Sequence, residues 1–496
     1  MRIKIHLLIA VLLMTSMIFA CSSEEKSMLY KAEKELFHAR KLNSELPPGS
    51  ARMEFVDRAV ESYRTIVDQY LSYADSVDGM EKIVVSSQME LAELEFRTGD
   101  LKNAIDDFQK AYSIAGNIPE ARANALWSAA FISEQTGDIS NAISLFKKFS
   151  DEFLNSEKIE KTSRMNRRYL LVPIRLSKLY SGSATENEKS AWLSKGERIY
   201  RDIISTTKDA ALLRETQYNL VTALLEQQKW GDAMALLKEM EKLYLTAADR
   251  PSILFLEAKI EMDGLNHPEK AASIFMTIVE EFPESQETVS ALLIVAGIHQ
   301  RAKRYNEAEK IYNQVIKEHK SSANGVVEAT WQLANISETQ GRWIDASLHY
   351  KSIYTSFPTT LQGMESPLRI ASHFEKLGET DAAENAYNRA LEHYDMLSAK
   401  EYETGIRIMA EEYGIRTLSL QKKWEKTAER LLSLPGKYPE YPRFAQNFLT
   451  AASIYEKELG NKEKAVETLE KCVERYPETT LSKEAKKHIN RMKGQK

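Results

Sequence analysis

A spaced pattern of small and apolar residues recurs along most of this chain. In its clearest form, a small residue is followed by an aromatic residue four positions later and by another small or apolar residue three positions after that, as in Ala104, Phe108 and Ala111. Positions separated in this way lie on one face of an α-helix, so each copy predicts a helix with one buried face. Equally clear copies begin at Ala142, Ala271, Ala308, Ala346, Ala383 and Ala465. Weaker copies begin at Ala59, Gly196, Ala233 and Ala428.

The residue that begins each copy, called the marker residue below, recurs at a nearly constant interval. Seven of the ten successive separations are 37 or 38 residues. Five copies carry a glycine five residues before the marker, where a left-handed residue ends a preceding helix. These glycines are Gly99, Gly137, Gly341, Gly378 and Gly460. Three copies carry a proline twelve residues after the marker, which ends the second helix. Each unit is therefore expected to be a helix, a tight turn, a second helix and a short connection.

This arrangement of glycine, small, aromatic and proline positions resembles the tetratricopeptide repeat. A further small residue twelve positions before the marker, as in Ala92 and Ala130, matches the close-packing position in the first helix of that family. The resemblance covers roughly residues 50–480 and implies an all-α, right-handed superhelical solenoid of about eleven helix–turn–helix units. The units are longer than the usual 34 residues of the family. They are similar in this to the repeats of bacterial lipoproteins for outer-membrane assembly and cell-division coordination.

Irregular spacing suggests how the repeats are grouped. The interval between Ala142 and Gly196 grows to 54 residues, which indicates a kinked unit or a hinge. We therefore expect an N-terminal array over residues 28–180 and a C-terminal array over residues 181–480. Residues 481–496 are expected to form a basic capping helix and tail, because a solenoid needs a polar outer face at its end.

The beginning of the chain has the pattern of an export signal. Arg2 and Lys4 precede an apolar stretch from Ile5 to Ala20 that is short for a membrane span and is followed abruptly by polar residues. The end of this stretch, Ile18-Phe19-Ala20-Cys21, resembles the lipobox of bacterial lipoproteins.

The lipobox resemblance implies a signal peptide over residues 1–20 and lipidation at Cys21, followed by a tether over residues 21–27. The expected location is then the bacterial cell envelope, on the outer membrane and facing the periplasm. Several acyl chains on one cysteine hold a protein on a bilayer stably, so the membrane would be contacted through the lipid anchor only.

Composition and charge exclude several other classes of protein. The chain has 496 residues, 43% of them hydrophobic and 28% charged, which is typical of a folded chain with a sizeable core. A formal net charge of −5 does not favour nucleic-acid binding, which needs a concentrated basic surface. No glycine-rich phosphate loop and no pair of histidines at metal-ligand spacing is present. The sequence therefore predicts no enzyme activity, no catalytic residues, no cofactor and no metal site.

Candidate partner-binding residues lie on the concave face that the resemblance implies. The family's groove-facing positions in the first helix precede the marker by seven to eighteen residues. They select Asn124, Trp127, Phe131, Glu134, Gln135, Tyr218, Glu328, Trp331, Asn335 and Glu338. Aromatic rings contribute much of the binding energy at protein interfaces, and neighbouring amides can satisfy the backbone of a bound peptide. A second interpretation is that Trp127 and Trp331 only pack against the next first helix.

The sequence thus predicts a lipid-anchored envelope scaffold that binds envelope proteins or peptide segments. Its roles would be in outer-membrane assembly, secretion or cell-wall coordination. The alternative is a glycan-binding or polysaccharide-export component, for which superhelical repeats also serve. Concave aromatic residues that stack on sugars would favour this alternative.

Overall fold

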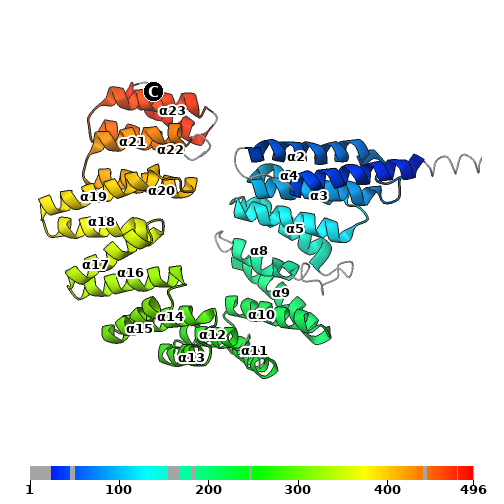
Figure 1. Cartoon of the computed structure of the whole chain (residues 1–496), viewed down its shortest axis with the longest axis horizontal. Helices are drawn as coiled ribbons and strands as arrows, with labels where there is room; N and C mark the ends of the chain where they lie inside the picture. The colour runs from blue at the N-terminus through cyan, green and yellow to red at the C-terminus, as the bar shows by residue number, and fades with distance from the viewer. Residues whose placement is uncertain are drawn as a thin grey trace, which may run out of the picture. The chain divides into compact units, whose positions relative to one another are not determined.

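A computed structural model describes residues 24–44, 51–154, 168–180, 186–244, 249–438, 444–477 and 479–494. Every described element is helical (Figure 1). The chain forms two compact units, Met1–Tyr244 and Leu245–Lys496. The signal-peptide and lipidation predictions, including Cys21, fall outside the described residues.

The first unit contains ten described α-helices and three short 3₁₀ or π segments. The α-helices are a helix over residues 24–44, α2 (Ala51–Tyr70), α3 (Met80–Thr98), α4 (Leu101–Ile114), α5 (Pro119–Gln135), α6 (Ile139–Phe149), α8 (Val172–Tyr180), α9 (Glu186–Thr206), α10 (Ala210–Glu226) and α11 (Trp230–Leu243). The short segments are η1 (Leu71–Tyr73), η2 (Ser150–Leu154) and η3 (Arg168–Leu171).

The second unit continues the same alternation of first and second helices. Its elements are α12 (Arg250–Lys259), η4 (Ile260–Gly264), α13 (Pro268–Glu281), α14 (Glu287–Arg301), α15 (Tyr305–Glu318), α16 (Ala323–Thr339), α17 (Trp343–Ser356), α18 (Leu361–Lys376), α19 (Thr380–Ala399), α20 (Thr404–Leu420), α21 (Trp424–Lys437), α22 (Ala445–Lys457), α23 (Lys462–Arg475) and α24 (Thr480–Met492). The all-α solenoid expected from the repeat pattern is confirmed.

Each of the eleven predicted marker residues lies in the second helix of a helix pair. Most of the alanine markers are completely buried, because first and second helices cross there and a larger side chain would separate them. Gly196 shows how tight this crossing is: a Cβ atom added there would lie 2.9 Å from Cβ of Pro173 on α8. The aromatic residue four positions after the marker then fills the space beside the crossing, as Tyr200 does without any exposed surface.

The turns between first and second helices share one backbone conformation. All five glycines that the pattern singled out have positive φ, from 64° at Gly460 to 91° at Gly99. Lys303 and Lys422 take the same conformation without glycine, with φ of 59° and 56°. In the tenth pair, Lys422 lies five residues before Thr427, so Thr427 takes the place of the marker rather than Ala428.

Two features of the structure lie at the expected boundaries of the arrays, and these boundaries stay a prediction. Helices α8 and α9, which flank the expected array boundary near residue 180, pack on each other within the first unit. Pro173 lies in the first turn of α8, where proline is tolerated because its missing N–H has no helical partner. The first described helix covers residues 24–44, which include the last part of the expected tether, and it packs through Ala32 and Leu36 on α2 and α3.

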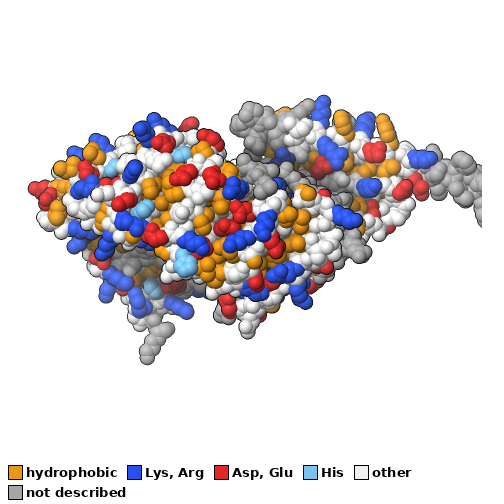
Figure 2. All heavy atoms as spheres, turned by 90° about the horizontal axis from the view of Figure 1, so that it is seen from below, with side chains coloured by type: hydrophobic (Ala, Val, Ile, Leu, Met, Phe, Trp, Pro, Cys, Tyr) orange, Lys and Arg blue, Asp and Glu red, His pale blue; other side chains and the backbone are white. Residues whose placement is uncertain are grey.

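Ion pairs connect successive second helices. A cation in the turn before one second helix reaches an acid on the preceding second helix, as in Lys229 with Glu197 (2.7 Å) and Arg304 with Glu269 (2.7 Å). Basic and acidic side chains are accordingly interspersed on the face drawn in Figure 2. At the C-terminal end, α24 packs its apolar side on α22 and α23, and its exposed lysines include Lys486.

Candidate functional site

The predicted groove residues of α5 pack against the helix pair that follows. Trp127 is only 7% exposed, and its ring is stacked on Phe131 with the centroids 5.1 Å apart. The guanidinium of Arg168 lies 4.2 Å from the centroid of the Trp127 ring and donates a hydrogen bond to Asn124. The Trp127 ring is therefore covered within the array.

A second arginine completes this contact. Arg175 on α8 donates a hydrogen bond of 2.7 Å to Glu134 and lies 5.0 Å from the centroid of the Phe131 ring. A cation over an aromatic face and beside a carboxylate gains from both interactions. Gln135, at the end of α5, remains exposed.

The equivalent residues of α16 form a similar arrangement. Trp331 makes an edge contact with Tyr350 at 5.3 Å, and the guanidinium of Arg369 on α18 lies 5.5 Å from the Trp331 centroid. The Tyr350 hydroxyl donates to Glu338 (2.9 Å) and to Asn335 (3.3 Å). Burial, together with the Glu338 charge, raises the pKa of Tyr350, so this hydroxyl stays protonated and acts as a donor.

The packing interpretation thus describes most of the predicted aromatic positions. Trp127 is buried, while Trp331, Phe131 and Tyr218 are half-buried. The rings of Trp127, Phe131 and Trp331 contact other residues of the array. Whether any of them also contacts a partner stays a prediction. Glu328 differs, because it lines an open cavity.

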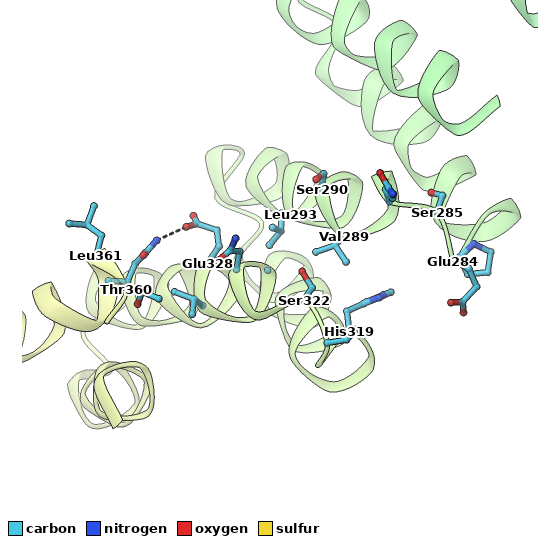
Figure 3. Close-up of a pocket in the computed structure, with 17 residues that line it drawn as sticks. Glu284, Ser285, Val289, Ser290, Leu293, His319, Ser322, Glu328, Thr360 and Leu361 are labelled. Atoms are coloured by element: carbon cyan, nitrogen blue, oxygen red, sulfur yellow. Dashed lines mark hydrogen bonds between the residues drawn. The ribbon is translucent and has the colours of Figure 1, made fainter. Parts of the chain in front are cut away.

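This cavity lies between α14, α16 and the beginning of α18. Its volume is about 920 Å³. Eight of its seventeen lining residues carry a hydroxyl or amide group, and apolar side chains lie among them. The lining consists of Pro283, Glu284, Ser285, Gln286, Val289, Ser290, Leu293, His319, Ser321, Ser322, Asn324, Gly325, Val327, Glu328, Thr360, Leu361 and Gln362. Figure 3 shows Val289 and Leu293 extending from α14 toward α16.

Two local features position the polar groups of the cavity. A Cβ atom added to Gly325 would lie 2.6 Å from Cγ1 of Val289, so glycine permits α16 to approach α14 at this point. The carboxylate of Glu328 accepts hydrogen bonds from Gln332 (2.8 Å) and from Gln362 (3.2 Å), the second of which is drawn in Figure 3. Glu328 is therefore held in one orientation at the edge of the cavity.

A smaller cavity of about 370 Å³ continues along the same two helices. It shares Leu293 and Glu328 with the larger cavity and adds Arg301 and Gln332. Its aromatic residue, Tyr312, is 2% exposed, donates a hydrogen bond of 2.9 Å to Gln300, and has a pKa raised by burial. We call the two cavities together the α14–α16 groove.

The sequence pattern found only one residue of the large cavity, Glu328. Most of the others lie in the connections between helix pairs or in the first turns of first helices, where the repeat pattern has no groove-facing position. Asn324-Gly325 was an available signal, since a glycine in the first turn of a helix often permits close approach of another backbone. Which cavities stay open depends on the packing between helix pairs.

Within the described ranges, no three His, Cys, Asp or Glu side chains converge as metal ligands would. Among these same ranges, no helix combines the length and the apolar character that crossing a bilayer requires.

Comparison with known proteins identifies two repeats directly. Residues 446–479, which include most of α22 and α23, match a family model described as tetratricopeptide repeat. Residues 85–118, over α3 and α4, match a second model with the same description. No curated protein matches the chain.

Several solved structures are similar in architecture. A tetratricopeptide repeat protein from Parabacteroides merdae aligns with 57% of this chain and 91% of its own, at 10% identity and a TM-score of 0.37. The quorum sensor NprR from B. thuringiensis, in its apo form, aligns with 74% of this chain and 98% of its own, at 11% identity and a TM-score of 0.38. Yeast Tom70 aligns with 93% of this chain and 96% of its own, at 14% identity and a TM-score of 0.33. All three TM-scores are low.

Proposed function

We propose that this tetratricopeptide repeat protein is an interaction scaffold that binds an extended segment of a partner protein in the α14–α16 groove. Stacked helical repeats of this kind present extended surfaces to other proteins. The observation that carries the proposal is the composition of the groove, in which hydroxyl and amide groups surround a few apolar side chains.

An extended peptide suits this lining because its backbone is not paired within itself. Each residue of such a peptide presents an N–H and a C=O that need partners when they leave water. Ser290, Asn324 and Gln362 offer donors and acceptors for them, and Val289 and Leu293 can receive an apolar side chain. A volume of about 920 Å³ lies within the usual range of ligand sites.

The glycan alternative has less support in this groove. Sugar recognition by stacking needs an exposed aromatic ring, and Tyr312, the aromatic residue that lines the smaller cavity, is 2% exposed. The larger cavity has no aromatic side chain other than His319 among its described lining residues.

The proposed place of action is the bacterial cell envelope, with acylated Cys21 as the anchor. The support is the lipobox-like sequence at residues 18–21 and the apolar segment before it. Envelope assembly, secretion or cell-wall coordination are the processes in which such an anchored scaffold would serve.

Partner binding in the groove can be tested by a substitution that fills the groove with a large side chain. Ser290 is an exposed cavity residue on α14, so Ser290→Arg should block the groove without disturbing the core. We expect recovery of partner proteins by the tagged protein to fall about tenfold or more, a loss of at least 1.4 kcal/mol.

The matched control for this experiment is Ser352→Arg, at an exposed position of α17 outside the groove. It should leave recovery unchanged, and circular dichroism should show equal helicity for both variants. Unchanged recovery with Ser290→Arg, measured by quantitative mass spectrometry, would place partner binding elsewhere.

A further inference from the structure

The first described helix, over residues 24–44, has two different faces. One face packs through Ala32, Leu36 and Ala39 into the core formed with α2 and α3. In Figure 1 this helix is dark blue and lies beside these two helices. On the opposite face, Tyr30 is 68% exposed and Phe37 is 64% exposed. These are two of the most exposed large apolar side chains of the described residues.

Lysines alternate with these two aromatic residues. Lys26, Tyr30, Lys34, Phe37 and Lys41 follow one another at intervals of four, four, three and four residues, which places them on one face of the helix. All five are exposed. We call this set the Tyr30–Phe37 stripe. No ion pair joins Lys26 or Lys34 to another described residue, so their charge is available to an anionic surface.

Residue 24 of this helix lies close to Cys21 in the sequence. Only Ser22 and Ser23 separate this cysteine from residue 24, and an extended chain spans at most about 3.6 Å per residue. If Cys21 is acylated, as the proposed function holds, the helix begins within about 10 Å of the lipid. A chain this short cannot carry the helix away from the headgroup region.

We propose that helix 24–44 lies along the surface of an anionic phospholipid bilayer, with the Tyr30–Phe37 stripe in the headgroup region. Tyr30 is suited to this depth because its ring leaves water while its hydroxyl stays hydrated. The Phe37 ring is wholly apolar and would be buried at the boundary of the acyl chains, as in other helices that lie on a membrane. Lysines beside them are attracted to anionic headgroups, and this attraction adds to a lipid anchor. The proposal rests on the proposed lipid anchor and adds a defined orientation of the first unit on the membrane.

The test uses chemical coupling, so that it does not depend on acylation in cells. The chain from Cys21 onward is attached through that thiol to a maleimide phospholipid, in vesicles that contain phosphatidylglycerol with brominated acyl chains. The other cysteine, Cys472, is buried and stays unreacted. The variant Phe37→Trp places a fluorescent ring in the stripe, and Leu348→Trp, at a 60% exposed position of the second unit, is the control.

We expect the brominated vesicles to remove most of the emission added by Phe37→Trp and none of that added by Leu348→Trp. Position 37 lies about 20 Å along the helix axis from residue 24, since the rise is 1.5 Å per residue. A helix that stands away from the bilayer would therefore leave this emission unquenched. Lys26→Glu with Lys34→Glu should weaken the quenching, as should high salt.

Unquenched emission of Phe37→Trp in the coupled protein would overturn the proposal and assign the stripe to a protein partner or to solvent. Failure of the anchor itself is distinguished by a separate experiment, the membrane fractionation of Cys21→Ser in cells. Quenching in coupled vesicles with no release of Cys21→Ser would support the surface contact and contradict acylation as the sole anchor.

Discussion

Individual turn residues show how a shared backbone conformation is reached with different side chains. Gly341 and Lys303 occupy equivalent turns, with φ of 73° and 59°. A left-handed conformation costs a residue with a Cβ roughly 1 kcal/mol more than it costs glycine. The position is conformationally demanding whether or not the sequence places glycine there.

Exchanging these residues should therefore change stability in opposite directions. Lys303→Gly is expected to raise the free energy of unfolding by about 0.5–1 kcal/mol, and Gly341→Ala to lower it by about 1 kcal/mol. A Cβ atom added at Gly341 would meet no other atom, and Lys303 is exposed. Changes in side-chain packing should therefore not mask the effect of the backbone conformation. Denaturant titration monitored by circular dichroism measures both values, and a stabilising Gly341→Ala would contradict this account.

A buried carboxyl on α3 makes the first unit sensitive to pH. Burial, and the neighbouring Asp107 carboxylate, raise the pKa of Glu95 to about 7, although Arg64 donates a hydrogen bond of 2.7 Å to it. A folded-state pKa above the unfolded value means that this group stabilises the fold at low pH. The stabilisation is lost as pH rises through about 7.

Glu95→Gln should remove this pH dependence because the amide does not ionise. Relative to the unsubstituted protein, the variant is expected to gain up to about 3 kcal/mol of stability between pH 5 and pH 8, at about 1.4 kcal/mol per pKa unit. Thermal melts across this pH range measure the difference. A gap between the two proteins that shrinks as pH rises would contradict the raised pKa.

At the scale of elements, a tyrosine hydroxyl joins the two helices of several pairs. Tyr312 donates to Gln300 (2.9 Å), Tyr350 to Glu338 (2.9 Å) and Tyr387 to Glu375 (2.6 Å). In each pair, the tyrosine follows the marker by four residues and the acceptor precedes it by eight. The pair of α5 and α6 has Phe146 instead, and its Glu134 pairs with Arg175 of the next first helix.

Removing one such hydroxyl should loosen its helix pair. Tyr350→Phe is expected to lower the free energy of unfolding by about 1.5 kcal/mol, because a hydrogen bond to a carboxylate is lost from a residue with no exposed surface. Tyr354→Phe, on the same helix and without a hydroxyl partner among the described residues, is the control and should change it by less than about 0.5 kcal/mol. Equal effects of the two changes, measured by denaturant titration, would contradict the role of this bond.

At the scale of the whole molecule, the proposed anchor decides where the scaffold acts. The lipobox-like sequence at residues 18–21 and the apolar segment before it support Cys21 as this anchor. Cys21→Ser is expected to move most of the protein from the membrane fraction to the soluble fraction. Immunoblotting of fractionated cells measures this, and continued sedimentation with membranes would discredit the acyl anchor.

Much of this organisation was predictable from local patterns. The marker residues, the left-handed glycines and the prolines determine where helices turn, because each acts through the backbone within a few residues of itself. The tenth pair shows the limit of this approach: Ala428 resembled a marker, but the turn conformation at Lys422 assigns that place to Thr427.

The candidate site could not be predicted in the same way. Trp127 occupies a position that faces the groove in the repeat pattern, yet Arg168, which follows it at a long distance in the chain, lies over its ring. The open groove between α14 and α16 depends instead on how closely two helices approach, which Gly325 and Val289 determine only when they are brought together.

The amino-acid sequence by itself therefore determined the repeat and most of the turns between its helices, since each rests on neighbouring residues, while the export signal stays a prediction. Only the tertiary structure decided which first-helix residues are covered, which cavities remain and which face of helix 24–44 is exposed. The physical reason is that burial and cavity shape arise from contacts between residues far apart in the chain.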